Sequence, residues 1–166
     1  MRHLLRESAG DSTAVCLAVH RWLEAHPEAR VIGTFAALPG EPDLLPLVAA
    51  HPERTWAFPT VRGESLTFHP VADVSRELTA GSFGIREPMA HLPELDAVNI
   101  DAFLCPGLAF TASGGRLGRG RGFYDRMLAL ARPEAVKLGV CFPFQLVEDT
   151  FGEAHDVKMD GVIGES

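Results

Sequence analysis

The segment from Gly114 to Arg126, GGRLGRGRGFYDR, constrains the fold of this chain more than any other part of its sequence. It follows an apolar run at 102–105 and leads into residues 124–131, where apolar side chains recur at the spacing of a helix. A strand, a glycine-rich loop and a helix in that order are typical of a layered α/β domain. In such domains ligands bind at the carboxyl ends of the strands, where this loop is expected.

The rest of the chain continues the alternation of strands and helices. We expect one α/β domain over residues 1–166, built in three layers with a mostly parallel sheet and helices on both faces. Pro59 is expected to end the second strand, and the Gly- and Pro-rich stretch 79–93 to form a long irregular loop, a kind that is often functional. The predicted helices are 12–26, 44–50, 73–78, 124–131 and 144–147, and the predicted strands are 31–37, 55–58, 66–71, 102–105, 136–142 and 161–163.

Glycines in the loop, at positions 118, 120 and 122, alternate with Arg119 and Arg121. A backbone without Cβ atoms can turn several N–H groups toward one anion, and guanidinium groups neutralise its charge. The dipole of the helix that follows also favours an anion at this position. The pattern therefore indicates a phosphate site.

Other interpretations of the loop fit its spacing less well. A nucleotide-binding P-loop requires Gly-Lys followed by Ser or Thr, whereas Phe123 follows Gly122 here. A dinucleotide site requires G-x-G-x-x-G, whereas these glycines run G-x-G-x-G; it remains an alternative, as does a plain flexible turn. A flexible turn would not explain arginines at 116, 119, 121 and 126 in a chain whose net charge is −7.

The negative net charge disfavours nonspecific binding to nucleic acids, which are held by broad basic surfaces. An RNA-binding role for the Arg-Gly repeats would need interleaved aromatic residues, and only Phe123 and Tyr124 lie near them. The sequence shows neither a leader nor an apolar run of about 18 residues, so we expect a soluble cytoplasmic protein without a membrane partner. Cys16, Cys105 and Cys141 lack metal-binding spacing and are expected to be reduced core residues.

Two groups of carboxylates are candidate magnesium ligands, because phosphate sites often hold a divalent cation. Asp125 lies at the junction of loop and helix, and an acidic cluster with Glu153, His155, Asp156 and Asp160 lies near the C-terminus. The alternatives are that Asp125 only complements the helix dipole and that the cluster is a solvated loop.

With these residues in view, the chain resembles the 5-formyltetrahydrofolate cyclo-ligase family over nearly its whole length. The order of the glycine-arginine, Gly-Ile-Arg-Glu-Pro and His-Asp motifs is specific to that family. The matching segments are Glu41 and Asp43, Pro59 with 66–68, 84–88, 106–110, 114–126, Gln145 and 155–160.

This resemblance implies an enzyme that uses ATP and Mg²⁺ to close 5-formyltetrahydrofolate to 5,10-methenyltetrahydrofolate, with release of ADP and phosphate. Its expected intermediate is an imidate phosphate, formed when the γ-phosphoryl group is transferred to the formyl oxygen. Catalysis would then depend on aligning two small-molecule substrates and neutralising phosphoryl charge, without a nucleophilic side chain. A noncatalytic paralogue that binds folate or nucleotide is the alternative, and the oligomeric state is not predicted.

The resemblance also implies roles for individual residues. Arg119 and Arg121 are the expected catalytic residues, and Asp125 and Asp156 the expected magnesium ligands. Glu41 is expected to bind the pterin through two N–H bonds; alternatively it complements the dipole of the helix that follows. The nucleotide is expected to contact Arg2, Arg6, Arg116, Leu117, Gly118, Arg119, Gly120, Arg121, Gly122, Phe123 and Tyr124, and the folate Ala36, Leu38, Glu41, Arg119, Gly120, Arg121, Gly122 and Phe123.

Two positions depart from the family pattern. Arg2, Leu5 and Arg6 have the spacing of the family's Lys-x-x-Leu-Arg opening, with arginine in place of lysine. Phe123 stands where the family usually has tyrosine, so the aromatic face is kept and a hydroxyl donor is lost.

Overall fold

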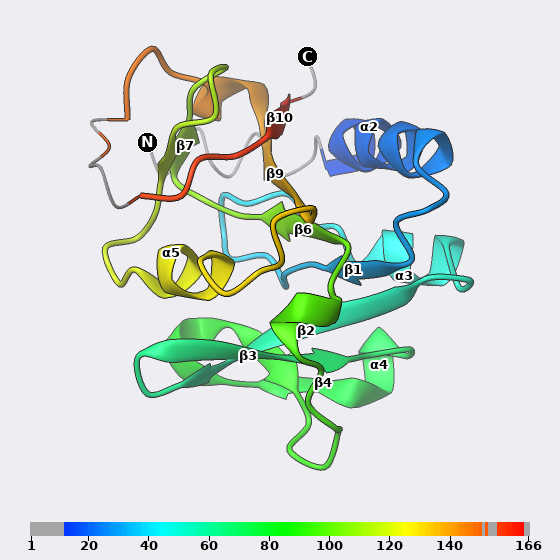
Figure 1. The fold of residues 1–166 in the computed structure, drawn as a ribbon. Coiled ribbons are helices and arrows are strands. Elements are labelled where there is room, and N and C mark those ends of the chain that lie inside the picture. The colour runs from blue at the N-terminus through cyan, green and yellow to red at the C-terminus, as the bar shows by residue number, and fades with distance from the viewer. Residues whose placement is uncertain (1–11, 151, 153–155, 165–166) are drawn as a thin grey trace.

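The computed structural model describes residues 12–150, 152 and 156–164, whose arrangement is shown in Figure 1. Within these residues the main sheet has six strands in the spatial order β10-β9-β6-β1-β2-β3. The pairs from β10 to β2 are parallel and β3 is antiparallel to β2, which confirms the predicted α/β class and mostly parallel sheet. The strands are β1 (Val31–Gly33), β2 (Thr55–Arg62), β3 (Ser65–Pro70), β6 (Ala102–Cys105), β9 (Val136–Cys141) and β10 (Gly161–Gly164).

Helices cover both faces of this sheet, as predicted. Along β6, Ala102 and Leu104 belong to one buried cluster, whereas Phe103 and Cys105 belong to another. Because successive residues of a strand point to opposite faces, the clusters lie on opposite sides of the sheet. One cluster includes Val15, Val19 and Leu23 of α2 (Ser12–Ala25), and the other includes Met127 and Leu128 of α5 (Phe123–Leu128).

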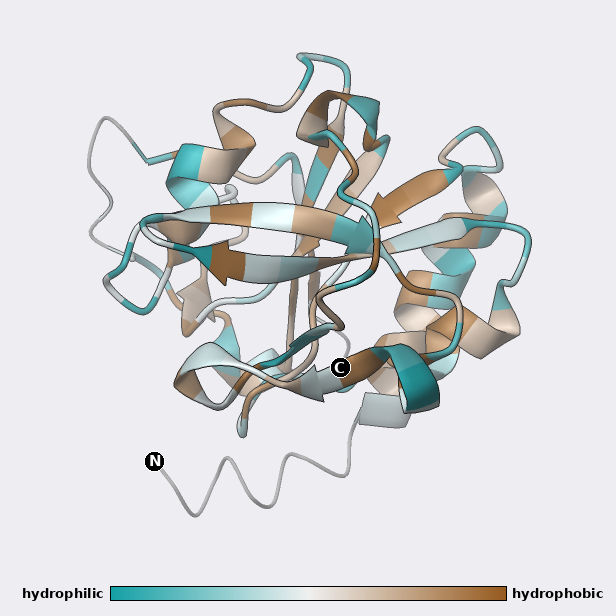
Figure 2. Cartoon of the chain, turned by 90° about the horizontal axis from the view of Figure 1, so that it is seen from below, coloured by the Kyte–Doolittle hydropathy of each residue, from teal (hydrophilic) through white to brown (hydrophobic). Residues whose placement is uncertain are grey.

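The remaining elements are short and connect or flank the strands of the sheet. In Figure 2, brown hydrophobic segments recur along the strands, whereas the peripheral loops are largely teal or pale. No helix in the described part of the chain is both long and apolar enough to cross a membrane. These elements are α3 (Pro46–Ala50), α4 (Val74–Glu77), β4 (Leu78–Ala80), η2 (Ser82–Gly84), β5 (Arg86–Pro88), η3 (Ala97–Asn99), β7 (Ala109–Phe110), β8 (Arg116–Leu117) and η4 (Pro143–Gln145).

Pro59 does not end the second strand, so that prediction was wrong. Strand β2 continues to Arg62, and Pro59 lies opposite Phe68 of β3. The Val61 N–H, which points to the same side of β2 as position 59, donates to the Glu87 carboxylate at 2.8 Å. On that side, β1 pairs with β2 only as far as Ala57. Pro59 lacks an N–H, but no neighbouring strand pairs with β2 at the position where that N–H would point.

Two further boundaries differ from the predictions. Strand β1 ends at Gly33 rather than at residue 37, because a buried apolar run does not by itself distinguish a strand from a buried loop. The stretch 79–93 is not wholly irregular, since β4 and β5 pair antiparallel around the short turn η2. This pair is connected to β2 through the Glu87–Val61 hydrogen bond.

Gly114 connects the segment after β7 to the chain that precedes β10. The Met159 N–H donates to the Gly114 carbonyl at 2.8 Å, and Gly114 has a φ of +102°. A Cβ at this position would lie 2.3 Å from the Met159 carbonyl oxygen. Glycine is therefore required both for the backbone conformation and for the close approach. This contact holds residues 156–160 beside the glycine-arginine loop.

We expect Gly114→Ala to lower the free energy of unfolding by more than about 2 kcal/mol, because it adds a steric clash to a left-handed backbone conformation. Gly63→Ala is the matched control, since Gly63 has a φ of +62° but open space where an added methyl group would lie. It should cost only about 1–2 kcal/mol, the conformational part alone. Urea unfolding of both variants measures the difference, and equal losses would contradict the role of the Met159 contact.

Candidate active site

A cavity of about 820 Å³ opens at the carboxyl ends of β1, β2 and β6. Phe35 and Ala36 follow β1, Val61 lies in the second half of β2, and Pro106 follows β6. Every residue to which the family resemblance assigns a site role, among those that the structure describes, lines this cavity, whereas Arg2 and Arg6 lie outside the described residues. The lining includes Ala36, Leu38, Glu41, Arg116, Leu117, Gly118, Arg119, Gly120, Arg121, Gly122, Phe123, Tyr124, Asp125 and Asp156.

Glu41 is held in the cavity wall by a tight turn. Its N–H donates to the Leu38 carbonyl at 2.9 Å across Pro39 and Gly40, and Gly40 has a φ of +90°. Pro followed by a glycine with positive φ suits a type II turn. The Leu38 N–H in turn donates to Glu41 Oε1 at 2.9 Å. Since α3 begins only at Pro46, Glu41 is not a first-turn residue of that helix, and the dipole interpretation was wrong.

The Glu41 carboxylate is buried, with 7% of the residue exposed, and Arg119 is its ion-pair partner. Arg119 Nη2 donates to Glu41 Oε2 at 3.2 Å, and 42% of the arginine side chain is exposed. Burial raises the pKa of Glu41, while the Leu38 N–H and the charge of Arg119 partly offset this effect. A buried carboxylate of this kind is stabilised by N–H donors. A ligand with two adjacent N–H groups could take the place of the guanidinium.

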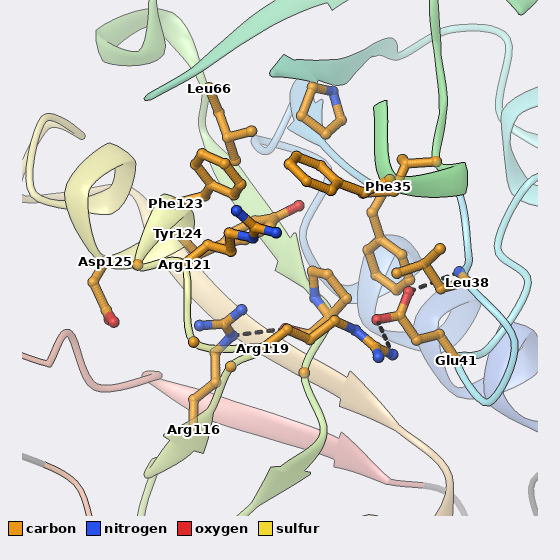
Figure 3. Close-up of a pocket in the computed structure, with 18 of the residues that line it drawn as sticks. Phe35, Leu38, Glu41, Leu66, Arg116, Arg119, Arg121, Phe123, Tyr124 and Asp125 are labelled. Atoms are coloured by element: carbon orange, nitrogen blue, oxygen red, sulfur yellow. Dashed lines mark hydrogen bonds and ion pairs between the residues drawn. The ribbon is translucent and has the colours of Figure 1, made fainter. Parts of the chain in front are cut away.

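Arg121 lies beside two aromatic rings at the cavity. Its guanidinium carbon is 4.3 Å from the centroid of the Phe83 ring, which in turn lies 6.2 Å from that of Phe123. Among the described residues, no hydrogen bond or ion pair holds the Arg121 guanidinium. Its donors are therefore available to an anion in the cavity. Figure 3 shows Arg121 beside the Phe123 ring, whereas Arg119 extends toward Glu41.

Arg116 and Arg126 have structural contacts that distinguish them from the other two arginines. Arg116 Nε donates to the Pro106 carbonyl at 2.7 Å, and its guanidinium carbon lies 4.9 Å from the Tyr124 ring centroid. Arg126 donates to the carbonyls of Glu64 and Arg121 at 2.7 and 2.8 Å. Arg126 thus connects the loop to the turn between β2 and β3, outside the cavity lining.

The Tyr124 hydroxyl is buried and has no hydrogen-bond partner among the described residues. Burial raises the pKa of Tyr124 well above its usual value, so its phenol stays neutral. Tyr124 still lines the cavity. Its contribution to the site is therefore an apolar surface on which Arg116 packs.

The glycines of the loop have different roles. Gly120 and Gly122 have φ values of +90° and +69°, and Gly122 is the N-cap of α5. At Gly120 a side chain would find open space, so its conformation rather than its surroundings requires glycine. Helix α5 has six residues, shorter than the predicted 124–131. The positive charge at the loop therefore comes mainly from the arginines.

Asp125 and the segment containing Asp156 meet at one side of the cavity. The Val157 N–H donates to Asp125 Oδ1 at 3.1 Å, and Asp156 also lines the cavity. Asp160 instead accepts from the Lys137 N–H at 2.8 Å at the start of β9, and is not in the lining. Glu153 and His155 lie outside the described residues.

Figure 3 shows Asp125 and Glu41 on opposite sides of the view, with the arginines between them.

The cavity also contains residues to which the sequence assigned no role. Phe83 is the most distinctive, since it has a φ of +59° and leaves 53% of its surface exposed. The Gly-Ile-Arg-Glu-Pro motif and the functional bias of long loops were the available signals for this region. The unassigned lining residues include Phe35, Pro59, Val61, Leu66, Phe83, Ile85 and Glu87.

Comparison with solved structures supports the same fold. A 5,10-methenyltetrahydrofolate synthetase from Aquifex aeolicus superposes with a TM-score of 0.78 at 29% identity, covering 96% of this chain and 80% of that one. A 5,10-methenyltetrahydrofolate synthetase from Mycoplasma pneumoniae superposes with a TM-score of 0.74 at 19% identity, covering 93% and 85%, and supports the fold alone.

Curated relatives share sequence with different parts of the chain. A 5-formyltetrahydrofolate cyclo-ligase from Mycolicibacterium smegmatis is 42% identical over 87 residues, which are 52% of this chain and 45% of the relative. A relative with the same description from Escherichia coli K12 is 29% identical over 149 residues, 81% of this chain and 78% of the relative. The chain thus spans about half the length of the first of these relatives. The model of the 5-formyltetrahydrofolate cyclo-ligase family matches residues 11–165, and the chain therefore belongs to that family.

Proposed function

We propose that this protein converts 5-formyltetrahydrofolate to 5,10-methenyltetrahydrofolate with ATP and Mg²⁺, and releases ADP and phosphate. The observation that carries the proposal is one cavity lined both by a buried carboxylate, Glu41, which pairs with Arg119, and by Arg121 of the same glycine-rich loop. Membership of the cyclo-ligase family supports the same reaction. The cavity volume of about 820 Å³ lies within the range of small-molecule sites.

The pterin would bind at the Glu41 side of the cavity. Phe35, Ala36 and Leu38 supply an apolar surface there, and the carboxylate supplies two acceptor oxygens. Adjacent N–H groups of the pterin ring and its 2-amino group would donate to Glu41 as a guanidinium does. Because Arg119 already donates to Oε2, the pterin would displace it and leave its guanidinium available to the phosphate.

The phosphates of ATP would bind at the loop. Arg119 and Arg121 would neutralise charge on the transferred phosphoryl group, and the N–H groups around Gly120 and Gly122 would contact its oxygens. Asp125 and Asp156 would hold Mg²⁺, which suits their carboxylate oxygens and supplies further charge neutralisation. Asp125 Oδ1 already accepts from Val157, so Oδ2 is the oxygen that we assign to the cation.

The reaction would proceed in two displacements. The formyl oxygen attacks the γ-phosphorus, and the bond from that phosphorus to the bridging oxygen of ADP breaks. The N10 nitrogen then attacks the formyl carbon, whose bond to the phosphorylated oxygen breaks, and the proton lost from N10 passes to the departing phosphate. The protein would contribute orientation and charge neutralisation rather than a nucleophile. The buried cysteines are consistent with the absence of a nucleophile, because burial raises the pKa of the Cys105 and Cys141 thiols to about 12 and so keeps them protonated.

The direct test mixes the purified protein with 5-formyltetrahydrofolate and Mg-ATP and follows the ultraviolet absorbance of the methenyl product. We expect product formation that stops when ATP is omitted or Mg²⁺ is chelated. Nucleotide and folate binding without product would instead favour a noncatalytic paralogue. Absence of binding to either ligand would refute both assignments.

Arg121→Ala should lower kcat/KM for ATP. The loss of transition-state stabilisation should be about 2–4 kcal/mol, the cost of losing one charge-stabilising donor. Arg119→Ala should have a similar effect. Arg76→Ala is the matched control, because its side chain is 86% exposed on α4 and lies outside the cavity. Steady-state kinetics with saturating folate measure the change, and unchanged turnover in both loop variants would remove the loop from the mechanism.

Glu41→Gln should weaken binding of 5-formyltetrahydrofolate by about 1–3 kcal/mol, because one ring donor would face an amide NH₂. Affinity for ATP should remain nearly unchanged. Calorimetric titration of each ligand measures both effects, and Glu94→Gln, an exposed position outside the cavity, is the control. Normal folate affinity in the Glu41 variant would exclude the carboxylate as the pterin contact.

A further inference from the structure

Two histidines and a glutamate form a cluster outside the proposed active site. His20 and Glu24 are one turn apart on α2, and His51 follows the last residue of α3. One ligand atom from each residue lies within 4.8 Å of the others. His20 Nδ1 and His51 Nε2 are 2.9 Å apart, and their ring centroids are 5.0 Å apart. The cluster thus joins two helices through side chains that commonly bind metals.

Glu53 fixes the tautomer of His51. His51 Nδ1 lies 3.2 Å from Glu53 Oε1, and a carboxylate can only accept a hydrogen bond. His51 therefore carries its proton on Nδ1, and the lone pair on Nε2 points toward His20. A histidine whose second nitrogen donates to a carboxylate is the usual arrangement around a protein-bound metal.

We propose that His20, Glu24 and His51 bind a divalent transition-metal ion such as Zn²⁺. Imidazole nitrogens with one carboxylate suit Zn²⁺ better than Mg²⁺. Two ligands about 2.0–2.1 Å from a tetrahedral Zn²⁺ are about 3.3 Å apart, so the two nitrogens need to separate by only about 0.4 Å. His20 would move its Nδ1 proton to Nε2, which requires no change in its charge.

The surroundings allow an ion to enter. His51 is 2% exposed, but Glu24 is exposed and can move toward the two nitrogens. A second cavity, about 430 Å³, is lined by Glu24, Pro27, Arg30, Glu53 and Arg54, so it reaches the two carboxylates of the site but not the histidines. A water molecule would complete the four ligands that Zn²⁺ usually takes. The carboxylates of Glu24 and Glu53 balance the charge of the ion, and Glu53 also lies 3.7 Å from Arg54 Nε.

The position of the cluster points to a structural role for the ion. His51 precedes β2, which begins at Thr55, so the cluster lies near the amino end of that strand. The proposed active site lies at the carboxyl ends of the sheet. An ion shared by α2 and α3 would link these helices and would stabilise the folded state without contacting the folate or ATP. The inference does not depend on the proposed function.

The test is titration of the chelator-treated full-length protein with ZnCl₂ by calorimetry, and with CoCl₂ by visible absorption. We expect one Zn²⁺ per chain, a higher thermal unfolding temperature with Zn²⁺, and the visible bands of tetrahedral Co²⁺. His20→Gln and His51→Gln should each weaken Zn²⁺ binding by at least about 100-fold, and Glu53→Gln by about 10-fold. Magnesium chloride should not displace Zn²⁺ or Co²⁺ from the cluster, even where Mg²⁺ binds at Asp125 and Asp156.

Control variants separate this site from other metal-binding groups. His26→Gln, Cys16→Ser and Asp125→Asn should retain the Co²⁺ bands and the Zn²⁺ affinity, because none of these residues belongs to the cluster. Circular dichroism checks folding; His20→Gln decides the test if the variant at buried position 51 does not fold. If wild-type protein binds Zn²⁺ no more tightly than His20→Gln, the histidines are only a hydrogen-bonded pair and the proposal is wrong.

Discussion

A mostly parallel sheet buried on both faces determines where this protein can place a binding site. Its strands present apolar side chains to both sides, as Leu104 and Phe103 do, so polar groups must gather where the strands end. The carboxyl ends of β1, β2 and β6 meet at one edge. The turn that carries Glu41 and the loop that carries Arg119 and Arg121 lie at this edge because the topology brings them there.

At that edge, Glu41 and Arg119 form an ion pair in which a ligand can replace one partner. A buried glutamate is costly without donors, and Arg119 supplies one at 3.2 Å while much of its own side chain remains exposed. The Leu38 N–H is part of the turn and is the fixed donor, whereas the guanidinium ends a long flexible side chain. Of the two donors to Glu41, Arg119 is therefore the one that a ligand can replace at lower cost.

The sequence predicted the elements with strong periodicity and the residues of the glycine-arginine loop. Strand 102–105 and the helix that begins at Ser12 agree with the structure, because burial and apolar spacing coincide in both. Pro59 was misjudged because the effect of a proline depends on which side of the strand has a partner, a tertiary property. The contacts of Phe83 with Arg121 and Phe123 could not be predicted from the sequence either, since they join segments that are distant in sequence.

The two edges of the sheet differ in how much their polar groups are constrained. At the carboxyl edge, the guanidinium of Arg121 packs only on an aromatic ring among the described residues, so a ligand gains its donors without breaking another hydrogen bond. At the opposite edge, Arg54 donates to the carbonyls of Leu23, His26 and Ala29, and its charge is already used to hold the end of α2. Arg54 and Arg121 carry the same charge but differ in what holds them, because three backbone carbonyls fix Arg54 whereas the Arg121 guanidinium has no such partner among the described residues. Their hydrogen-bond partners therefore decide which of the two guanidiniums a ligand can reach at low cost.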